Sequence, residues 1–422
     1  MKKDKICISN IINIGDEILS GHTVNTNSSY IASILYDIGI FTKRITAISD
    51  MKKDIIAQLD ESMKNSDLIF ITGGLGPTND DLTKKVICAY FGFELKFRED
   101  IWKHILELFS KRGLIPDEIN IEQALFPDSI IAVPIFNSVG TAPGIHIKFD
   151  DKHIFVMPGV PNEMKTMMSD YVTPFLKDNF SDILYYRDIN TTDIPESSLY
   201  SILSNDPAFP FGCDIAFLPQ GYGVTVRVKN FGEKDFRKNY VDKAVLTIES
   251  LIRNKIFAYD MKTPQEELVA VLKNLKLKIS VAESCTGGLF MNNLTNVPGA
   301  SGIFTEGFVT YSNDSKFNTL SVNSQTLCID GAVSTVTVSE MLDGLLAVTK
   351  AGIVCAISGI AGPDGGSVYK PVGTVVLGFC LREKNKRFVN KFLFTGDRIT
   401  IKEKASNKLM VEIIKYLKKD YN

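Results

Sequence analysis

The sequence predicts a multidomain α/β protein, and three observations carry this prediction. The chain has 422 residues, which is too long for one ordinary hydrophobic core, and about three domains are expected. Its composition, 45% hydrophobic and 23% charged, is that of a globular protein. Apolar segments of strand length alternate with amphipathic segments of helical period, and this alternation is typical of parallel βαβ units.

The N-terminal segment, residues 1–175, is predicted to form an α/β sandwich. Strand-like and helix-like runs alternate along it, and the loops that follow its later strands are rich in Gly and Pro. The predicted elements are a strand at 6–15, a helix at 28–39, a strand at 41–49, a helix at 52–66, and strands at 67–74, 130–136 and 153–159.

Residues 176–260 are predicted to form a small α+β linker domain with the element order β-α-β-β-α. Its residues show no concentrated polar cluster. The predicted elements are a strand and a helix within 182–206, strands at 213–220 and 223–231, and a helix at 242–254.

The third predicted domain, residues 261–422, is again α/β. A capped helix opens it, with Thr263 as the N-cap and Pro264 at the first helical position. The remaining predicted elements are strands at 278–288, 303–312, 353–363 and 373–379, and a last helix at 402–419.

Charge and cysteine usage exclude several classes of protein. The net charge is −2, from 47 basic and 49 acidic residues that are well mixed, which argues against a dedicated nucleic-acid or anionic-membrane surface. The seven cysteines show no metal-ligand spacing, and the four histidines form no HExxH pattern. An odd number of free thiols and the lack of a long apolar span favour a cytoplasmic location.

Two loops of the first domain bear candidate binding residues. In ITGGLGPTNDDLT (71–83), Gly73 and Gly74 let the backbone approach a ligand closely, and the following helix N-terminus suits a phosphate. Asp80 and Asp81 would repel that phosphate unless a divalent cation lay between them. The alternative is that one of these aspartates only caps the helix and the glycines only form a turn.

The other loop, GDEILSGHTVNTN (15–27), follows the first strand at the edge where the sheet meets solvent. Glu17 joins Asp80 and Asp81 as a candidate metal ligand, and Asn25 and Asn27 are candidate substrate-binding residues.

The third domain carries the unusual string AESCTGG (282–288) at a strand end. It is either an elaborate helix cap or a loop that presents a nucleophile, Ser284. A serine nucleophile needs a base, and this domain has no histidine, so we expect a lysine kept neutral by burial or by nearby positive charge. Lys316, in TYSNDSK (310–316), is the candidate base. Cys285 is the rival nucleophile, but neighbouring side chains in an extended segment point to opposite faces.

Further strand ends of this domain supply groups suited to an anionic substrate. The loop ISGIAGPDGG (357–366) offers Ser358, Gly359 and backbone amides that could hold an oxyanion or a phosphate. Arg398 is a bidentate phosphate partner. Thr286 and Tyr311 are further candidate substrate-binding residues. Together, these groups are what the hydrolysis of a small phosphorylated amide requires.

At these motifs the sequence resembles the CinA family, the competence/damage-inducible proteins, over nearly its full length. The N-terminal third resembles the molybdopterin-binding MoaB/MogA-like domain through GDEILSG, NTN, TGGLGPTNDD, VGTAPG and MPGVP. The C-terminal third resembles nicotinamide-nucleotide amidase, the PncC-type deamidase, through AESCTGG, YSNDSK, GAVS, SGIAGPDGG, KPVGTV and GDR. The middle segment resembles the KH-like linker domain of full-length members, and it lacks a GxxG loop, so no RNA binding is expected there.

The resemblance implies two activities of pyridine-nucleotide salvage. The C-terminal domain would convert nicotinamide mononucleotide and water into nicotinate mononucleotide and ammonia, without a cofactor. The N-terminal domain would hydrolyse ADP-ribose to AMP and ribose 5-phosphate with a divalent metal ion. The expected partners are these small nucleotides and a second copy of the chain in a homodimer, with neither nucleic acid nor membrane.

Residue by residue, the resemblance assigns roles to five positions. Ser284 matches the family's serine in AESCTGG, and Lys316 matches the lysine of its YSNxxK string. Tyr311 and Arg398 match positions that line the nucleotide pocket. Ser358 stands where the family more often has threonine. The hydroxyl group is therefore present, and the methyl group of threonine, with its packing contacts, is absent. In the linker, PESS replaces the usual GES-type string.

Two other interpretations remain open at this point. The N-terminal domain could bind molybdopterin or a nucleotide without catalysing a reaction, because one fold serves many functions. An accessory role in DNA uptake or repair is the non-enzymatic alternative, and the balanced charge counts against it.

Overall fold

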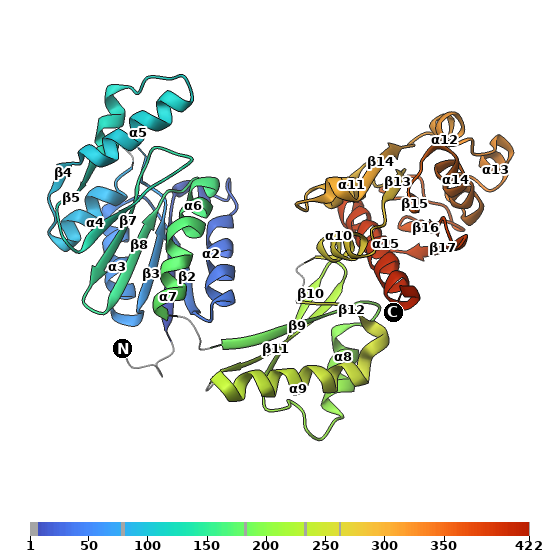
Figure 1. Ribbon diagram of the computed structural model, residues 1–422, viewed down its shortest axis with the longest axis horizontal. Coiled ribbons are helices and arrows are strands. Elements are labelled where there is room, and N and C mark those ends of the chain that lie inside the picture. Colours follow the sequence, from blue (N-terminus) through green and yellow to red (C-terminus); the bar gives the residue numbers. More distant parts are fainter. Residues whose placement is uncertain (1–6, 77–80, 181–183, 232–233, 261–262, 422) are drawn as a thin grey trace. The chain divides into compact units, whose positions relative to one another are not determined.

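The computed structural model describes residues 7–76, 81–180, 184–231, 234–260 and 263–421. The chain divides into two compact units, Met1–Tyr185 with Phe231–Arg237, and Tyr186–Asn230 with Lys238–Asn422 (Figure 1). Among the described residues, no helix is long and apolar enough to cross a membrane.

The first unit is built on a six-stranded sheet with the order β2-β1-β3-β8-β7-β6. Strands β1, β2, β3 and β8 are parallel, and β7 and β6 continue the sheet as antiparallel strands. The strands are β1 (Ile8–Ile14), β2 (Phe41–Ile48), β3 (Leu68–Thr72), β6 (Ala132–Ile135), β7 (Gly144–Phe149) and β8 (Lys152–Met157), with a separate antiparallel pair β4 (Leu95–Phe97) and β5 (Leu125–Pro127).

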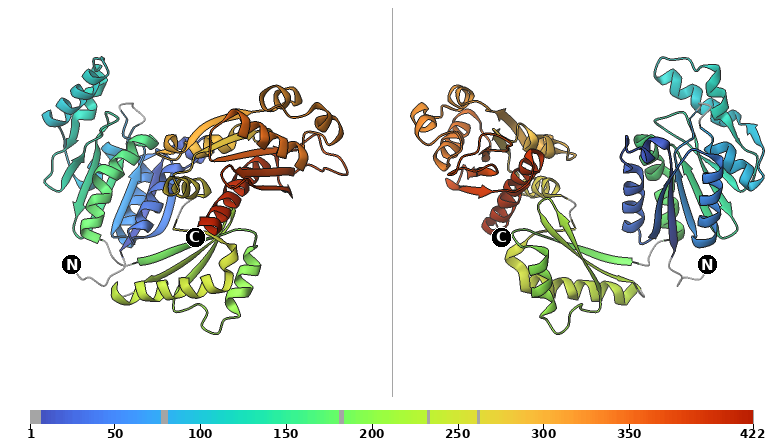
Figure 2. Two further views of the ribbon diagram at one scale, coloured as in Figure 1. Left: turned by 45° about the vertical axis from the view of Figure 1, so that its right-hand side comes forward. Right: turned by 180° about the vertical axis from the view of Figure 1, so that it is seen from behind.

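Helices cover both faces of this sheet (Figure 2). Ile11 of β1 packs with α2 and α6–α7 on one face, and its neighbour Ile12 packs with α3, α4 and α5 on the other, as the alternation of side chains along a strand requires. The helices are α1 (Asp16–Leu19), α2 (Thr26–Asp37), α3 (Lys52–Asn65), α4 (Thr83–Phe91), α5 (Glu99–Lys111), η1 (Glu118–Ala124), α6 (Pro161–Met167), η2 (Met168–Val172) and α7 (Thr173–Phe180).

The predicted α/β class of this segment is confirmed, and the strands β4, β5 and β7 were missed. The segments predicted at 6–15, 41–49, 67–74 and 130–136 contain β1, β2, β3 and β6, and the segment predicted at 153–159 overlaps β8. Strand β7 was not predicted. Its sequence GIHIKF is short and forms a tight antiparallel hairpin with β8 around Asp150, so no helical run separates the two strands. The edge of the sheet is therefore antiparallel rather than parallel.

The second unit contains two sheets. The smaller sheet has the order β10-β11-β9-β12, and its last strand was also missed because it is only four residues long. Its elements are β9 (Leu184–Thr191), α8 (Glu196–Ser204), β10 (Asp214–Gln220), β11 (Gly223–Phe231), α9 (Lys234–Ile252), η3 (Arg253–Lys255) and β12 (Ile256–Tyr259).

The larger sheet of this unit has the order β14-β13-β15-β16-β17, with β13, β14 and β15 parallel and the other two strands antiparallel. Thr263 caps its first helix and Pro264 occupies the first turn, as predicted. The elements are α10 (Pro264–Asn274), β13 (Ile279–Glu283), α11 (Leu289–Thr295), η4 (Ala300–Gly302), β14 (Phe304–Val309), α12 (Asn313–Leu320), α13 (Ser324–Ile329), α14 (Thr335–Val348), β15 (Ile353–Gly359), β16 (Thr374–Leu381), β17 (Lys386–Leu393) and α15 (Arg398–Tyr421).

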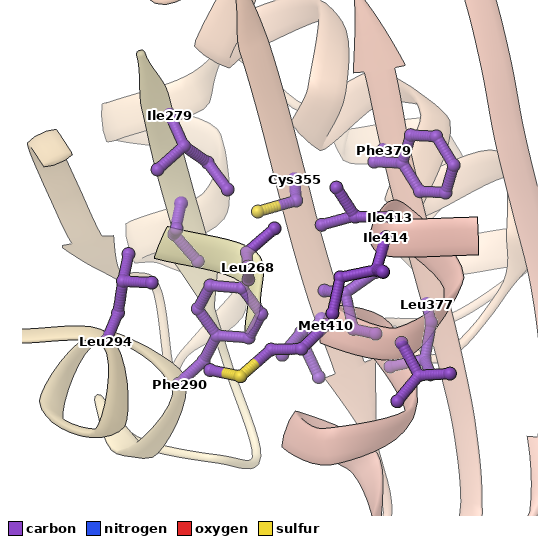
Figure 3. Packing of buried hydrophobic residues seen from close by; sticks show 14 of the residues in the cluster. Leu268, Ile279, Phe290, Leu294, Cys355, Leu377, Phe379, Met410, Ile413 and Ile414 are labelled. Carbon is purple, nitrogen blue, oxygen red and sulfur yellow. The ribbon is translucent and has the colours of Figure 1, made fainter. Parts of the chain in front are cut away.

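The two faces of this larger sheet carry separate hydrophobic clusters. On one face, α10, α11 and α15 pack against β13, β15 and β16, with Phe290 and Met410 near the centre (Figure 3). On the other face, α12 and α14 pack against the same strands around Ala282 and Met341. The end of β13 thus lies between the layer of α10, α11 and α15 and the layer of α12 and α14.

The smaller sheet is tied to α15 within the same unit. Asp193 forms ion pairs with Lys408 at 2.5 Å and with Lys415 at 3.6 Å, and Lys418 donates to the carbonyl of Phe257 at 2.8 Å. These contacts group the predicted linker with the C-terminal sheet. The boundaries 1–175, 176–260 and 261–422 stay a prediction.

Candidate functional site

Ser284 and Lys316 meet at the carboxyl end of β13. Lys316 Nζ lies 3.0 Å from Ser284 Oγ, and both side chains are buried, at 0% and 7% exposure. Lys316 comes from α12, which Ser312 caps through a bond from the Ser315 amide. The parallel pairing of β13 with β14 places the start of α12 beside the loop that carries Ser284.

The surroundings of Lys316 favour its neutral form. Burial lowers the pKa of Lys316 to about 8. Its Nζ also donates to the carbonyls of Thr310 at 2.8 Å and Tyr311 at 3.3 Å. A neutral amine has two N–H donors and one lone pair, so the two carbonyls can take both donors and leave the lone pair for the hydroxyl of Ser284. This is the arrangement of a base beside a nucleophile.

Cys285 turns away from this pair. Its side chain is 6% exposed and belongs to the hydrophobic cluster of α10, α11 and α15. Burial raises the pKa of the Cys285 thiol to about 11. A Cβ built on Gly359 would lie 3.0 Å from Cys285 Sγ, so this glycine makes room for the thiol. Cys285 is a packed core residue with little thiolate at neutral pH.

The predicted anion-binding residues gather beside the pair. One Nη of Arg398 donates to the carbonyl of Gly362 at 2.6 Å, and the other donates to the hydroxyl of Tyr311 at 2.9 Å. Tyr311 is 59% exposed, so this ring borders solvent. Ser358, in contrast to Tyr311, is buried. Its hydroxyl donates to the carbonyl of Ala332 at 2.6 Å, and this bond holds the end of β15 in place.

Glu283 holds the loop after Ser284 in place through hydrogen bonds to its carboxylate. The sequence did not single out this residue as a candidate. The carboxylate of Glu283 is fully buried and accepts from the amides of Gly288 at 2.9 Å, Phe290 at 3.2 Å and Met291 at 2.9 Å. An acidic residue at the end of a predicted buried strand was the available signal. Thr286 is fully buried, and its hydroxyl has no hydrogen-bond partner among the described residues.

The first unit has a cavity of about 440 Å³ at the carboxyl ends of β1, β3 and β8. This is the edge at which open α/β sheets bind ligands. The predicted residues Glu17, Gly73, Gly74 and Asp81 all line it, whereas Asp80 lies outside the described residues. Helix α4 begins at Thr83 without a side-chain cap, so Asp81 does not act as the cap of that helix.

Both glycines of the TGG string are required by the backbone. Gly73 and Gly74 have φ angles of +114° and +64°, a region that side chains disfavour. A Cβ on Gly73 would lie 2.0 Å from the carbonyl oxygen of Ile14, and one on Gly74 would lie 2.2 Å from Thr83 Oγ1. In this turn, backbone atoms without side chains therefore form part of the cavity wall.

The two predicted asparagines lie beside the cavity and have structural partners. Asn25 caps α2 by accepting from the amide of Ser28 at 3.1 Å. Asn27 is buried and donates to Thr72 Oγ1 at 3.0 Å and to the carbonyl of Gly159 at 2.8 Å, which ties β3 to the loop after β8. Neither asparagine is among the residues that line the cavity.

Two acidic residues of the cavity were missed. Asp50 follows β2, and burial together with the charges of Asp16, Glu17 and Asp81 raises its pKa, opposed by a bond from the Asp16 amide. Burial also raises the pKa of Glu163, whose Oε2 accepts from Asn137 at 2.7 Å. Both residues directly follow predicted strands or their glycine loops, and that position was the available signal.

The described carboxylates do not by themselves form a metal site. Among residues 7–76, 81–180 and the other described ranges, no three His, Cys, Asp or Glu side chains could hold one ion. Of the predicted set, Glu17 and Asp81 line one cavity, and Asp80 lies outside the described residues.

Comparisons with known proteins identify the family of each part of the chain. A family profile described as "CinA C-terminal domain" matches residues 261–417, and one described as "Probable molybdopterin binding domain" matches residues 10–178. The CinA-like protein of Chloroherpeton thalassium is 39% identical over 408 residues, covering 94% of this chain and 96% of that protein. The CinA-like protein of Chlorobaculum tepidum is 38% identical over 419 residues, with coverage of 96% and 98%.

Solved structures are similar to one part of the chain. The protein CinA from Thermoplasma acidophilum, described as of unknown function, is 32% identical, covers 40% of this chain and 96% of its own, and has a TM-score of 0.36. The competence/damage inducible protein CihA from Agrobacterium tumefaciens is 37% identical, with coverage of 37% and 98% and a TM-score of 0.35. On the evidence of its full-length relatives, the chain belongs to the CinA family.

Proposed function

We propose that the C-terminal site hydrolyses the carboxamide of nicotinamide mononucleotide to nicotinate mononucleotide and ammonia. The observation that carries the proposal is the 3.0 Å contact between Ser284 Oγ and the Nζ of a fully buried lysine. A lysine with a pKa of about 8 is an effective base near neutral pH, and no histidine lies in residues 154–422.

The reaction runs in two halves. Ser284 Oγ attacks the carboxamide carbon while Lys316 Nζ takes the hydroxyl proton, and the carbonyl electrons move to oxygen. The C–N bond then breaks, the lysine returns its proton to the leaving nitrogen, and ammonia departs from a nicotinoyl ester of Ser284. Water next attacks this ester with Lys316 again as base, and the proton returns to Ser284 as nicotinate mononucleotide leaves.

The negative oxygen needs donors during both halves. The amide of Ser284 itself is occupied, because it donates to the carbonyl of Ile357 at 2.9 Å. Among the described residues, the amides of Cys285 and Thr286 donate to no other residue's backbone or side-chain acceptor, so these two are the candidates for an oxyanion hole. Glu283 keeps this loop in place by holding the amides that follow it.

Arg398 would bind the 5′-phosphate, with Tyr311 beside it. Two of the five guanidinium donors are used by Gly362 and Tyr311, which fixes the plane of the group and leaves the others for an anion.

Ammonia release tests this proposal directly. Purified protein is incubated with nicotinamide mononucleotide, and ammonia and nicotinate mononucleotide are quantified together. We expect equal amounts of the two products. No release of ammonia would contradict the proposed function.

For the first unit we propose a second activity, the hydrolysis of ADP-ribose to AMP and ribose 5-phosphate with a divalent cation. A cavity of about 440 Å³, walled by a glycine turn and by acidic side chains, supports it. Asp81→Asn should abolish the hydrolysis without unfolding the unit, and a chelator should abolish it in the wild type. ADP-ribose that binds without being hydrolysed would instead favour a nucleotide- or molybdopterin-binding module.

A further inference from the structure

Helix α15 carries a lysine whose position differs from that of its neighbours. Lys404 donates to the carbonyl of Thr395, and Lys408, Lys415 and Lys418 all pair with acidic side chains. Lys402 is partly buried, yet within the described residues it has neither an ion pair nor a hydrogen-bond partner. Because no group of the described protein takes its N–H donors, the ammonium group of Lys402 is available to an anionic ligand.

The position of Lys402 joins it to the site already described. It lies four residues after Arg398, and residues with this spacing share one face of a helix. A Cβ built on Gly287, in the loop that follows Ser284, would lie 3.9 Å from Lys402 Nζ. The ammonium group therefore lies close to the nucleophile loop, on a residue one helical turn after Arg398.

We propose that Lys402 binds the phosphate of the substrate together with Arg398, so that the enzyme selects phosphorylated nicotinamide compounds over the unphosphorylated riboside. This inference rests on the proposed deamidase function. The two cations are complementary, because the planar guanidinium fixes the direction of the anion and the ammonium adds a second point charge. A phosphate carries close to two negative charges at neutral pH, which one arginine would leave partly uncompensated.

A pair of substrates tests the proposal. Nicotinamide mononucleotide and nicotinamide riboside share the carboxamide and differ by the phosphate. In Lys402→Met, kcat/KM for the mononucleotide should fall roughly 10- to 100-fold, the effect of losing one charge-assisted hydrogen bond, while kcat/KM for the riboside should not change. Lys402→Arg should restore most of the loss. Lys419→Met, at an exposed lysine in the last turn of the same helix, is the control for net charge and should behave as wild type.

The possible outcomes separate this proposal from the function on which it rests. Equal losses on the two substrates would mean that Lys402 only supports the fold, and unchanged kinetics would mean that it does not meet the phosphate; either result overturns the proposal. Calorimetric titration with the mononucleotide measures the same contact without catalysis. A wild type that binds the mononucleotide but releases no ammonia contradicts the deamidase function alone, whereas equal affinities of wild type and Lys402→Met contradict the phosphate site.

Discussion

Each of the two units contains a lysine with a lowered pKa, and the two lysines differ in burial and in one contact. Lys316 is fully buried, whereas Lys84 is half-buried. Burial lowers the pKa of Lys84 in α4 and of Lys316 in α12 to about 8. Each donates to two backbone carbonyls, and each lies near a buried cysteine, Cys88 or Cys285. Only Lys316 also reaches a side-chain hydroxyl, that of Ser284.

This difference shows that a shifted pKa does not identify a catalytic base. Lys84 bonds to the carbonyls of Glu122 and Leu125 and so fastens η1 to α4. Its perturbed pKa is a consequence of that structural role. Burial lowers the pKa of Lys316 as it does that of Lys84, but the hydroxyl of Ser284 lies in contact with Lys316, and this contact is the reason for proposing Lys316 as the base.

The largest expected effect comes from removing each lysine in turn. Lys316→Met should lower the rate of ammonia release from nicotinamide mononucleotide by roughly 10²- to 10⁴-fold, because it removes the base. Lys84→Met should leave that rate unchanged and should destabilise the first unit by about 1–3 kcal/mol, because two carbonyls lose their donor.

Trp102, the single tryptophan, lies in the first unit, so its fluorescence during thermal unfolding reports that unit. A loss of deamidation in Lys84→Met, with Lys316→Met still active, would reverse the comparison and overturn the assignment of roles.

The pH profile of deamidation should also distinguish the role of Lys316 from that of Lys84. The base must be neutral, and the fraction of neutral Lys316 rises with pH up to its pKa of about 8. The value of kcat/KM should therefore increase about tenfold per pH unit below that pKa and level off above it. Lys84→Met should show the same profile. Lys316→Arg should be inactive at every pH tested, because a guanidinium does not deprotonate in this range; an active Lys316→Arg enzyme would exclude the lysine as base.

A smaller expected effect is a difference between the two units in their stability at acid pH. All four histidines of the chain lie in its first 153 residues. Burial lowers the pKa values of His146 and His153 to about 4, and the two rings share a hydrogen bond of 2.9 Å. A histidine with a lowered folded pKa contributes its full stability above pH 6.5 and loses it as the pH falls toward 4. At pH 5 the loss is roughly 2 kcal/mol for each histidine.

Acidification to pH 5 should therefore lower the unfolding midpoint seen by Trp102 fluorescence more than the midpoint at which deamidation is lost. The variant His146→Phe with His153→Phe should reduce this sensitivity to acid. If acidification lowers the deamidation midpoint of the wild type by as much as the Trp102 midpoint, or if the double variant is equally sensitive, the histidine pair does not control the acid stability of the first unit.

The sequence predicted those parts of the molecule in which local pattern and packing agree. The parallel strands β1, β3, β13 and β15 are rich in apolar residues and buried on both faces, and they were found near their predicted positions. Strands β7, β12 and β17 were missed, because short or exposed antiparallel strands take their identity from the neighbour with which they pair.

In the candidate site, too, the sequence predicted the residues whose chemistry is evident locally and missed those that depend on contacts between distant segments. Ser284 and Lys316 were named from residue chemistry, and their contact follows from the pairing of β13 with β14. Glu283 and Lys402 were not named, because a buried carboxylate below a loop and a lysine without a partner become visible only when distant segments are brought together.

The central claim is that Ser284, and not its neighbour Cys285, is the nucleophile. The most direct measurement is ammonia release from nicotinamide mononucleotide by Ser284→Ala and Cys285→Ala in parallel, with folding checked by circular dichroism. The first variant should lose roughly 10³-fold or more in rate, because the attacking oxygen is gone. The second should stay within a few-fold of wild type, because it removes only a packed thiol and keeps the backbone amide. If Cys285→Ala is the inactive variant and Ser284→Ala remains active, the serine–lysine mechanism is wrong and a cysteine amidase takes its place.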